Sequence, residues 1–170
     1  MNLPPINQKM GDQTDAGGIC AVFVYGTLKR GELRGGRWPR AALRIQPAWV
    51  VGELYDLGPY PALLPHQNTE APAQQVLAQR VLGELWELAP ADMPETLRVL
   101  DDIEGYRNKA DDLYERHLID VHCGTGTNPD EQELKRAFTY FYARRSELQA
   151  GQRIVPDDQG WCSWSAIRLC

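Results

Sequence analysis

The sequence predicts an α+β protein in which a small, barrel-like mixed β-sheet is flanked by a few helices. Five to seven short apolar segments, separated by turn residues, follow one another along the 170 residues. Only one segment has the clear spacing of an amphipathic helix, so the regular strand–helix alternation of a doubly wound parallel sheet is missing. We expect residues 19–170 to form one domain, which at this size needs no cofactor or disulfide to fold.

The first half of the chain contains four predicted strands. Residues 1–18 are polar and rich in Gly, Pro, Asn and Gln, which favours a flexible tail over a targeting peptide. The prolines within 58–65 confine the strand there to a sheet edge or a bulge. The strands over 51–57 and 82–88 have similar sequences. The predicted elements are a strand over 19–25, a loop over 31–42, a strand over 51–57, a turn into a short strand over 58–65, an exposed excursion over 66–79 and a strand over 82–88.

The second half contains the clearest helix. Asp92 is placed to cap its N-terminus, and Leu97, Leu100 and Ile103 are spaced to face a core. Trp161 and Trp164 are expected to pack near the end of the chain. The other predicted elements are a strand over 114–123, a turn over 124–130, a strand over 137–143, a short helix over 146–152 and a closing segment over 160–167.

Composition excludes several classes of protein. The net charge of −5 argues against nucleic acid as the main partner, and no apolar run approaches the roughly 20 residues of a membrane-spanning helix. The four cysteines show no paired spacing, so we expect free thiols in a reducing, cytoplasmic environment. They are Cys20, Cys123, Cys162 and Cys170.

One short region departs from the acidic average. Six basic residues follow the first strand with a single acid, Glu32, among them. Two interpretations remain open, a solvated surface or the rim of a site for an anionic ligand. The six are Lys29, Arg30, Arg34, Arg37, Arg40 and Arg44.

Two segments have residues suited to chemistry. The first strand runs into a turn bounded by Gly26 and Gly31, where backbone N–H groups can be aimed at an anion or a developing oxyanion. Glu104 lies where the helix ends, between Ile103 and Gly105. If it faces a cavity, burial would raise its pKa and make it a general base, whereas a solvated position would leave it without a role.

These segments resemble the γ-glutamylcyclotransferase-like (AIG2-like) family. The similarity rests on Tyr25-Gly26-Thr27-Leu28 with Gly31, and on Leu100-Asp101-x-x-Glu104-Gly105 followed by Tyr114-x-Arg116. The motifs occur in the family's order over roughly residues 23–142. The resemblance implies a barrel-like sheet with an active cavity beside the Tyr-Gly-Thr-Leu turn.

The resemblance also implies a reaction and a set of residues. The α-amine of a γ-glutamyl substrate attacks its own γ-carbonyl, releasing 5-oxoproline and a free amine without a metal, a cofactor or an enzyme nucleophile. Glu104 is implied as the acid/base, and the N–H groups of Gly26, Thr27 and Leu28 would hold the oxyanion or the substrate α-carboxylate. Tyr25 and Tyr142 are implied to line the pocket, although a core position for Tyr25 remains open.

Other functions fit the sequence less well. Glu32-Leu33 stands where a phosphate-binding loop needs Lys-Ser/Thr. His117 and His122 fall on opposite faces of one strand, which disfavours a metal site. His122 and Cys123 are neighbours on that strand and also point to opposite faces, which disfavours a nucleophilic Cys-His pair. A non-catalytic module that binds a small anion or a protein remains the main rival. Arg34 stands in the region where many family members carry an Asn, so the substrate amide stays open.

Overall fold

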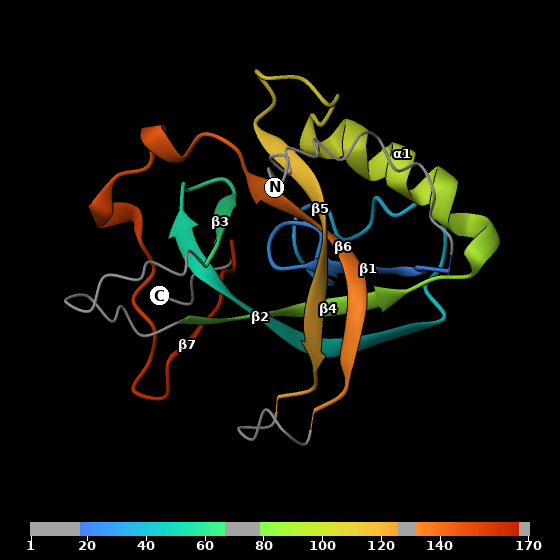
Figure 1. Ribbon diagram of the computed structural model, residues 1–170, viewed down its shortest axis with the longest axis horizontal. Coiled ribbons are helices and arrows are strands. Elements are labelled where there is room, and N and C mark those ends of the chain that lie inside the picture. The colour runs from blue at the N-terminus through green and yellow to red at the C-terminus, as the bar shows by residue number, and fades with distance from the viewer. Residues whose placement is uncertain (1–17, 67–78, 126–131, 167–170) are drawn as a thin grey trace, which may run out of the picture.

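The computed structural model describes residues 18–66, 79–125 and 132–166, and five of its strands close into a barrel (Figure 1). The strand order is β3-β2-β5-β6-β1-β4-β7, and an additional β2–β4 pairing closes the ring. The β1–β6 and β4–β7 pairs are parallel and the others antiparallel, so the sheet is mixed, as predicted. The strands are β1 (Ala21–Val24), β2 (Arg44–Asp56), β3 (Pro61–Pro65), β4 (Gln79–Glu87), β5 (Tyr114–Cys123), β6 (Leu134–Tyr142) and β7 (Trp161–Cys162).

The strand β1 is buried on both faces, and this explains why all four of its residues are apolar. Ala21 and Phe23 belong to a cluster with residues from every other barrel strand, which fills the barrel interior. Val22 and Val24 belong to a second cluster with the apolar face of the helix. Because successive side chains of a strand point to opposite faces, β1 connects the two cores.

The helix α1 (Met93–Glu104) covers the outer face of the barrel next to β1 (Figure 1). Leu97 and Leu100 are buried against the barrel, as their spacing predicts. The helix ends at Gly105, whose φ of 69° lies in the left-handed region that glycine adopts readily. The end of α1, and with it Glu104, therefore has a defined position beside the end of β1.

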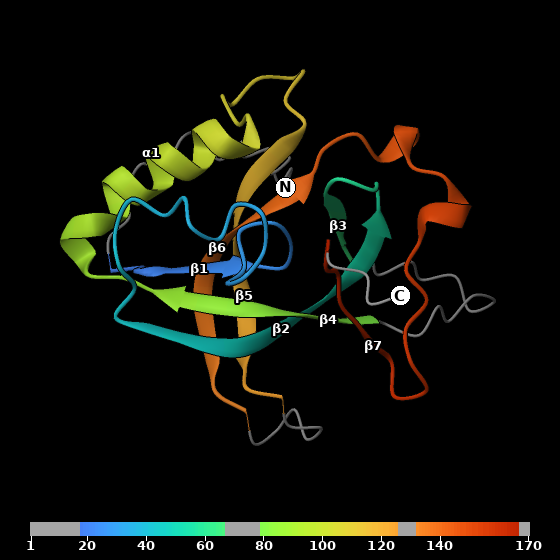
Figure 2. The same cartoon turned by 180° about the vertical axis from the view of Figure 1, so that it is seen from behind.

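The segment that joins β1 to β2 runs beside α1, as the blue-to-cyan trace in Figure 2 shows. Arg40 in this segment pairs with Glu95 on the helix at 2.6 Å. Trp38 stacks on Trp86 of β4 with ring centroids 4.1 Å apart. These contacts hold an otherwise irregular loop against both the helix and the barrel.

Some local predictions were wrong. Asp92 occupies the N-cap position of α1, as predicted, but its side chain makes no capping hydrogen bond; it also ends a short 3-10 turn (Pro90–Asp92), and its carboxylate lies 3.6 Å from the Arg40 guanidinium. The short helix expected over 146–152 is two 3-10 turns, Arg145–Glu147 and Ala150–Gln152. The strand predicted to start at residue 51 is β2, which begins seven residues earlier, at Arg44.

Other predictions agree with the structure or fall outside its described part. Strand β5 has the predicted bounds. Strand β3 lies at the edge of the sheet, as predicted, where the missing N–H groups of its prolines cost no hydrogen bond to a second neighbouring strand. Trp164 is buried in the barrel-interior cluster. The described cysteines, Cys20, Cys123 and Cys162, are free thiols. Residues 1–17, most of the excursion expected over 66–79, most of the turn expected over 124–130, and Cys170 lie outside the described residues.

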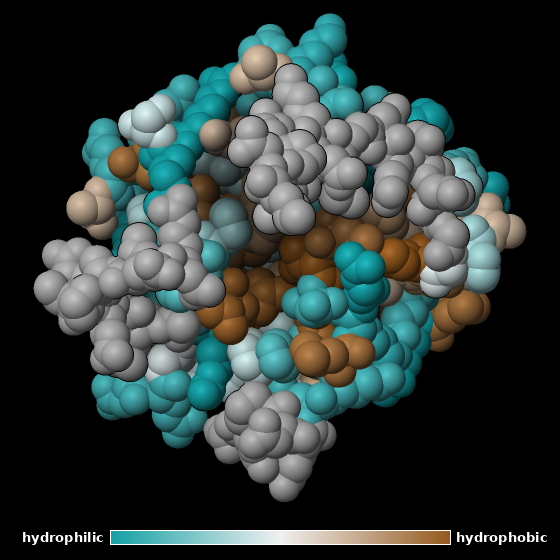
Figure 3. Space-filling model, in the orientation of Figure 1, coloured by the Kyte–Doolittle hydropathy of each residue, from teal (hydrophilic) through white to brown (hydrophobic). Residues whose placement is uncertain are grey.

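On the face of the molecule shown in Figure 3, apolar residues are visible near the centre and hydrophilic residues surround them. The described helix α1 has 12 residues, too few to cross a membrane, and no other described helix is long and apolar enough to do so.

Candidate active site

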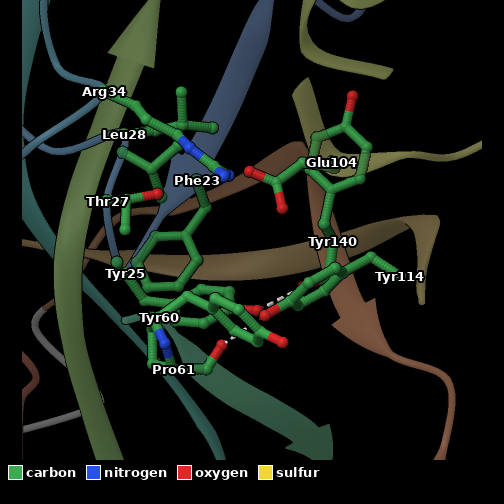
Figure 4. A pocket seen from close by; sticks show the side chains of 12 residues that line it. Phe23, Tyr25, Thr27, Leu28, Arg34, Tyr60, Pro61, Glu104, Tyr114 and Tyr140 are labelled. Carbon is green, nitrogen blue, oxygen red and sulfur yellow. Dashed lines mark hydrogen bonds between the residues drawn. The ribbon is translucent and has the colours of Figure 1, made fainter. Parts of the chain in front are cut away.

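A cavity lies where β1 ends, between the following turn, the start of β3 and the C-terminal end of α1 (Figure 4). Its empty volume is about 360 Å³, part of it open to solvent. Backbone and side chains from six segments meet here. The lining residues are Phe23, Val24, Tyr25, Gly26, Thr27, Leu28, Arg34, Tyr60, Pro61, Glu104, Tyr114 and Tyr140.

The turn after β1 forms one wall of the cavity. Gly26 lies so close to Pro61 that a Cβ atom on it would stand 2.6 Å from the Pro61 Cγ atom, so only glycine fits this approach. The carbonyls of Gly26 and Thr27 accept hydrogen bonds from the N–H groups of Lys29 (3.1 Å) and Arg34 (2.8 Å). The N–H groups of Gly26, Thr27 and Leu28 have no hydrogen-bond acceptor within the described part of the chain. They are therefore available to an anionic group in the cavity.

Glu104 places its carboxyl group in the same cavity, opposite the turn (Figure 4). Burial raises the pKa of this carboxyl to about 7, and the nearby positive charge of Arg34 opposes the shift. A carboxyl with this pKa exchanges a proton readily at neutral pH, as a general acid/base must. The structure thus places Glu104 in the cavity, where the sequence alone left a solvated position open.

Three tyrosines form the floor and far side of the cavity. The Tyr25 hydroxyl donates to the Tyr140 carbonyl (2.6 Å), and the Tyr114 hydroxyl donates to the Pro61 carbonyl (2.6 Å). Burial raises the pKa of all three phenols well above the usual value for tyrosine, so they stay neutral. The sequence left open whether Tyr25 is a core residue or lines the pocket. The structure shows both, because Tyr25 is buried and also lines the cavity.

The carboxylate of Asp101 connects the helix to two strands behind the cavity. It accepts hydrogen bonds from the Tyr140 hydroxyl (2.7 Å) and from the Arg116 guanidinium (2.6 Å). Asp101 lies three residues before Glu104, so this contact ties the last turn of α1 to β6 and β5. The network supports the orientation of both Glu104 and Tyr140 in the cavity wall.

Most of the basic residues after β1 are engaged away from the cavity. Arg34 alone among the six lines it, and the others for which the structure records side-chain contacts bond elsewhere within the described residues. Those contacts are Lys29 to the Trp164 carbonyl, Arg30 to Glu84, Arg40 to Glu95 and Arg44 to Glu87. The region is therefore mostly paired surface, with one cation at the cavity.

Tyr142 does not line the cavity. It lies on the same face of β6 as Tyr140 but two residues further along, where its ring meets that of Tyr114 edge-on at 5.6 Å. Its hydroxyl is 3.4 Å from a Glu147 carboxylate oxygen. The family resemblance implied Tyr142, but Tyr140, two residues earlier on the same face of β6, lines the cavity instead. Tyr60, Tyr114 and Arg34 also line the cavity and were not named as site residues.

No group of three His, Cys, Asp or Glu side chains gathers as a metal site among the residues at 18–66, 79–125 and 132–166. His122 instead stacks on Trp49, with ring centroids 3.8 Å apart. His117 lies beside Glu115 at 3.3 Å. His117 and His122 thus contact other side chains away from the cavity.

Comparison with known proteins agrees with the fold and the motifs. A family model described as γ-glutamyl cyclotransferase, AIG2-like, matches residues 22–163. A γ-L-glutamyl-butirosin B γ-glutamyl cyclotransferase of Niallia circulans is 31% identical over 131 residues, which are 75% of this chain and 70% of the relative.

Two solved structures show the same fold at low sequence identity. An AIG2-like protein of Mus musculus has a TM-score of 0.52 at 21% identity, over 82% of this chain and 97% of that one. A γ-glutamyl cyclotransferase specific to glutathione, from yeast, has a TM-score of 0.51 at 16% identity, over 74% of this chain and 69% of that one. The barrel, the cavity motifs and the match over most of the chain lead to one conclusion: this protein belongs to the γ-glutamyl cyclotransferase, AIG2-like family.

Proposed function

We propose that the protein cleaves a γ-glutamyl amide by intramolecular cyclisation, releasing 5-oxoproline and a free amine, with Glu104 as the general acid/base. Family membership supports γ-glutamyl cyclotransfer as the general reaction. The observation that carries the specific proposal is the Glu104 carboxyl, buried in the cavity opposite the Gly26–Leu28 turn, with a pKa of about 7.

The first step is proton removal. The Glu104 carboxylate takes a proton from the substrate α-ammonium group, and the neutral amine then attacks the γ-carbonyl carbon of the same molecule. A new C–N bond closes a five-membered ring, and the carbonyl oxygen becomes an oxyanion. The cavity contributes by holding the substrate folded, with amine and carbonyl in contact.

The second step is collapse of the tetrahedral intermediate. The N–H groups of Gly26, Thr27 and Leu28 stabilise the oxyanion while it exists, because they are fixed by the turn and need no reorganisation. When the carbonyl re-forms, the original amide C–N bond breaks and the leaving nitrogen takes the proton from Glu104. The regenerated carboxylate accepts the second proton of the former ammonium nitrogen, which leaves the neutral lactam, and passes this proton to the free amine, which departs as an ammonium ion. The neutral Tyr25, Tyr114 and Tyr140 enclose the ring.

The test measures 5-oxoproline released from a panel of γ-glutamyl amides by the wild type and by Glu104→Gln. The panel covers γ-glutamyl amino acids, glutathione, γ-glutamyl-lysine, simple γ-glutamylamines and a γ-glutamylated aminoglycoside, because the relative from Niallia circulans is named for γ-L-glutamyl-butirosin B. We expect product from the wild type and a loss of at least about 100-fold in kcat in the variant.

Glu95→Gln is the matched control, since Glu95 lies on the same helix but pairs with Arg40 outside the cavity. It should keep wild-type activity. Equal rates for the wild type and Glu104→Gln would remove Glu104 as the acid/base. No product from either across the panel would favour the rival function, a module that binds a small anion or a protein on the same fold.

A further inference from the structure

Arg34 is the one cationic side chain among the residues that the structure places around the cavity. Its neighbours in the basic region point elsewhere: Arg30 pairs with Glu84 at 3.1 Å, and Arg40 pairs with Glu95 at 2.6 Å. Arg34 therefore differs from the paired surface around it in lining the cavity.

The backbone of Arg34 is held on both sides. Its N–H donates to the Thr27 carbonyl (2.8 Å), and its own carbonyl accepts from the Arg37 N–H (3.0 Å). Its side chain is partly buried and one guanidinium nitrogen lies 3.5 Å from the carbonyl of Ile103, at the end of α1. The guanidinium is thus positioned between the turn and the helix end.

The Arg34 guanidinium faces the Glu104 carboxyl across the cavity (Figure 4). No ion pair joins the two groups in the described structure, and their electrostatic interaction acts at longer range. Most of the donors of Arg34 are consequently available to a ligand that enters between the two side chains.

The γ-glutamyl group has charges that match this arrangement. Its α-carbon carries an ammonium group and a carboxylate side by side. When the ammonium group meets Glu104, the carboxylate on the same carbon lies next to it and can turn toward Arg34, which faces Glu104 across the cavity. A guanidinium binds a carboxylate through two parallel N–H donors, so charge and geometry agree.

We propose that Arg34 binds the α-carboxylate of the γ-glutamyl group and thereby selects γ-glutamyl amides over otherwise identical amides that lack this carboxylate. The assignment rests on the proposed cyclotransferase function. It leaves the N–H groups of Gly26, Thr27 and Leu28 for the oxyanion, so the α-carboxylate and the oxyanion have separate sets of donors.

The kinetic test compares two substrates with the same leaving amine, a γ-L-glutamyl amide and a 4-aminobutyryl amide. Both can close a five-membered ring, giving 5-oxoproline and 2-pyrrolidinone, and they differ only in the α-carboxylate. We expect the wild type to prefer the γ-glutamyl amide by at least about tenfold in kcat/KM. Arg34→Gln should lose this preference, and Arg34→Lys should retain part of it.

Arg37→Gln is the matched control, because Arg37 is exposed on the same loop and does not line the cavity. It should keep the full preference. A preference that is unchanged in Arg34→Gln, or a wild type that cleaves both amides equally well, would overturn the assignment while leaving the cyclotransferase function intact.

A binding measurement separates the assignment from the reaction. Calorimetry compares L-5-oxoproline with 2-pyrrolidinone, which has the same ring without the carboxylate. We expect tighter binding of L-5-oxoproline by the wild type and by Arg37→Gln, with the difference lost in Arg34→Gln. If no amide is cleaved but this pattern is found, the proposed reaction fails and the carboxylate site stands. If the wild type does not distinguish the two rings, the carboxylate site fails.

Discussion

Two side chains of opposite charge, Glu104 and Arg34, govern the ionisation of the cavity. Burial raises the pKa of Glu104 to about 7, and Arg34 limits the rise by stabilising the carboxylate. Among the other titratable groups around the cavity, Tyr25, Tyr114 and Tyr140 stay neutral because burial raises the pKa of each. The proton affinity of the site therefore depends mainly on how deeply Glu104 is buried and on a single cation.

This balance predicts the pH dependence of the reaction. The kcat/KM of the wild type should rise with pH through about 7, as Glu104 loses its proton and becomes a base. Arg34→Gln removes the charge that stabilises the carboxylate, so the same limb should move to higher pH. The substrate ionises equally in both measurements, and a profile that is identical in the two proteins would contradict the coupling.

Burial of Glu104 also predicts a cost in stability. Its pKa is raised above its value in the unfolded chain, so between about pH 4.5 and 7 the native state binds more protons and stability falls as pH rises. Glu104→Gln removes this cost, and we expect it to be more stable than the wild type at pH 8, by up to about 3 kcal/mol, with no gain at pH 4.

Chemical denaturation at the two pH values measures this difference. Glu133→Gln is the control, since the Glu133 side chain is 62% exposed and its removal should change the free energy of unfolding little. A variant at position 104 that is less stable than the wild type at pH 8 would show that the carboxylate is stabilised by its surroundings.

At the scale of elements, the site depends on how firmly α1 is held against the strands. Asp101 joins the helix to Tyr140 of β6 and to Arg116 of β5, with distances of 2.7 and 2.6 Å. The Arg116 guanidinium also lies over the Tyr106 ring, 5.4 Å from its centroid, just after the helix. These contacts fix the helix end that carries Glu104.

Asp101→Asn should therefore weaken both the fold and the reaction. The neutral amide keeps the shape but loses the charge-assisted bond to Arg116, and we expect a loss of about 1–3 kcal/mol in the free energy of unfolding together with a lower kcat. Asp102→Asn is the matched control, because the Asp102 side chain is 79% exposed. Thermal unfolding and turnover are both measured, and equal behaviour of the two variants would exclude a positioning role for Asp101.

At the scale of the whole molecule, closure of the barrel creates the cavity. Strand β4 pairs with both β1 and β2, and the parallel β1–β6 pair completes the ring. Thr139 of β6, fully buried, donates from its hydroxyl to the Phe23 carbonyl of β1 (3.0 Å). The end of β1 is thereby placed between β6 and the helix, where the cavity opens.

Gly83 of β4 allows this closure. A Cβ atom there would collide with the Val24 carbonyl and stand 2.7 Å from the Phe23 ring. Gly83→Ala should thus cost about 1–3 kcal/mol by overpacking. Gly151→Ala, at a position with open space around the added atom, should be neutral. Urea unfolding of both variants checks the prediction, and an unchanged midpoint for Gly83→Ala would contradict it.

Local sequence patterns predicted most elements because strands and helices have short-range signals. The alternation from Tyr114 to Cys123 gives the bounds of β5, and the spacing of Leu97 and Leu100 gives the buried face of α1. The first half of β2 was missed because Arg44, Gln46 and Pro47 interrupt the apolar pattern. Those residues form a strand through their pairing with β4, between Arg44–Glu87 and Pro47–Glu84, a contact between segments about 40 residues apart in sequence.

The sequence by itself determined the barrel-like α+β class, the turn at Gly26–Leu28 and the placement of Glu104 at a helix end. These follow from residue type and spacing over a few positions. Only the tertiary structure decided that Glu104 is buried, that Tyr140 instead of Tyr142 lines the cavity, and that Arg34 faces the carboxyl. Burial and charge proximity depend on which distant segments pair, and that pairing is determined by closure of the whole barrel.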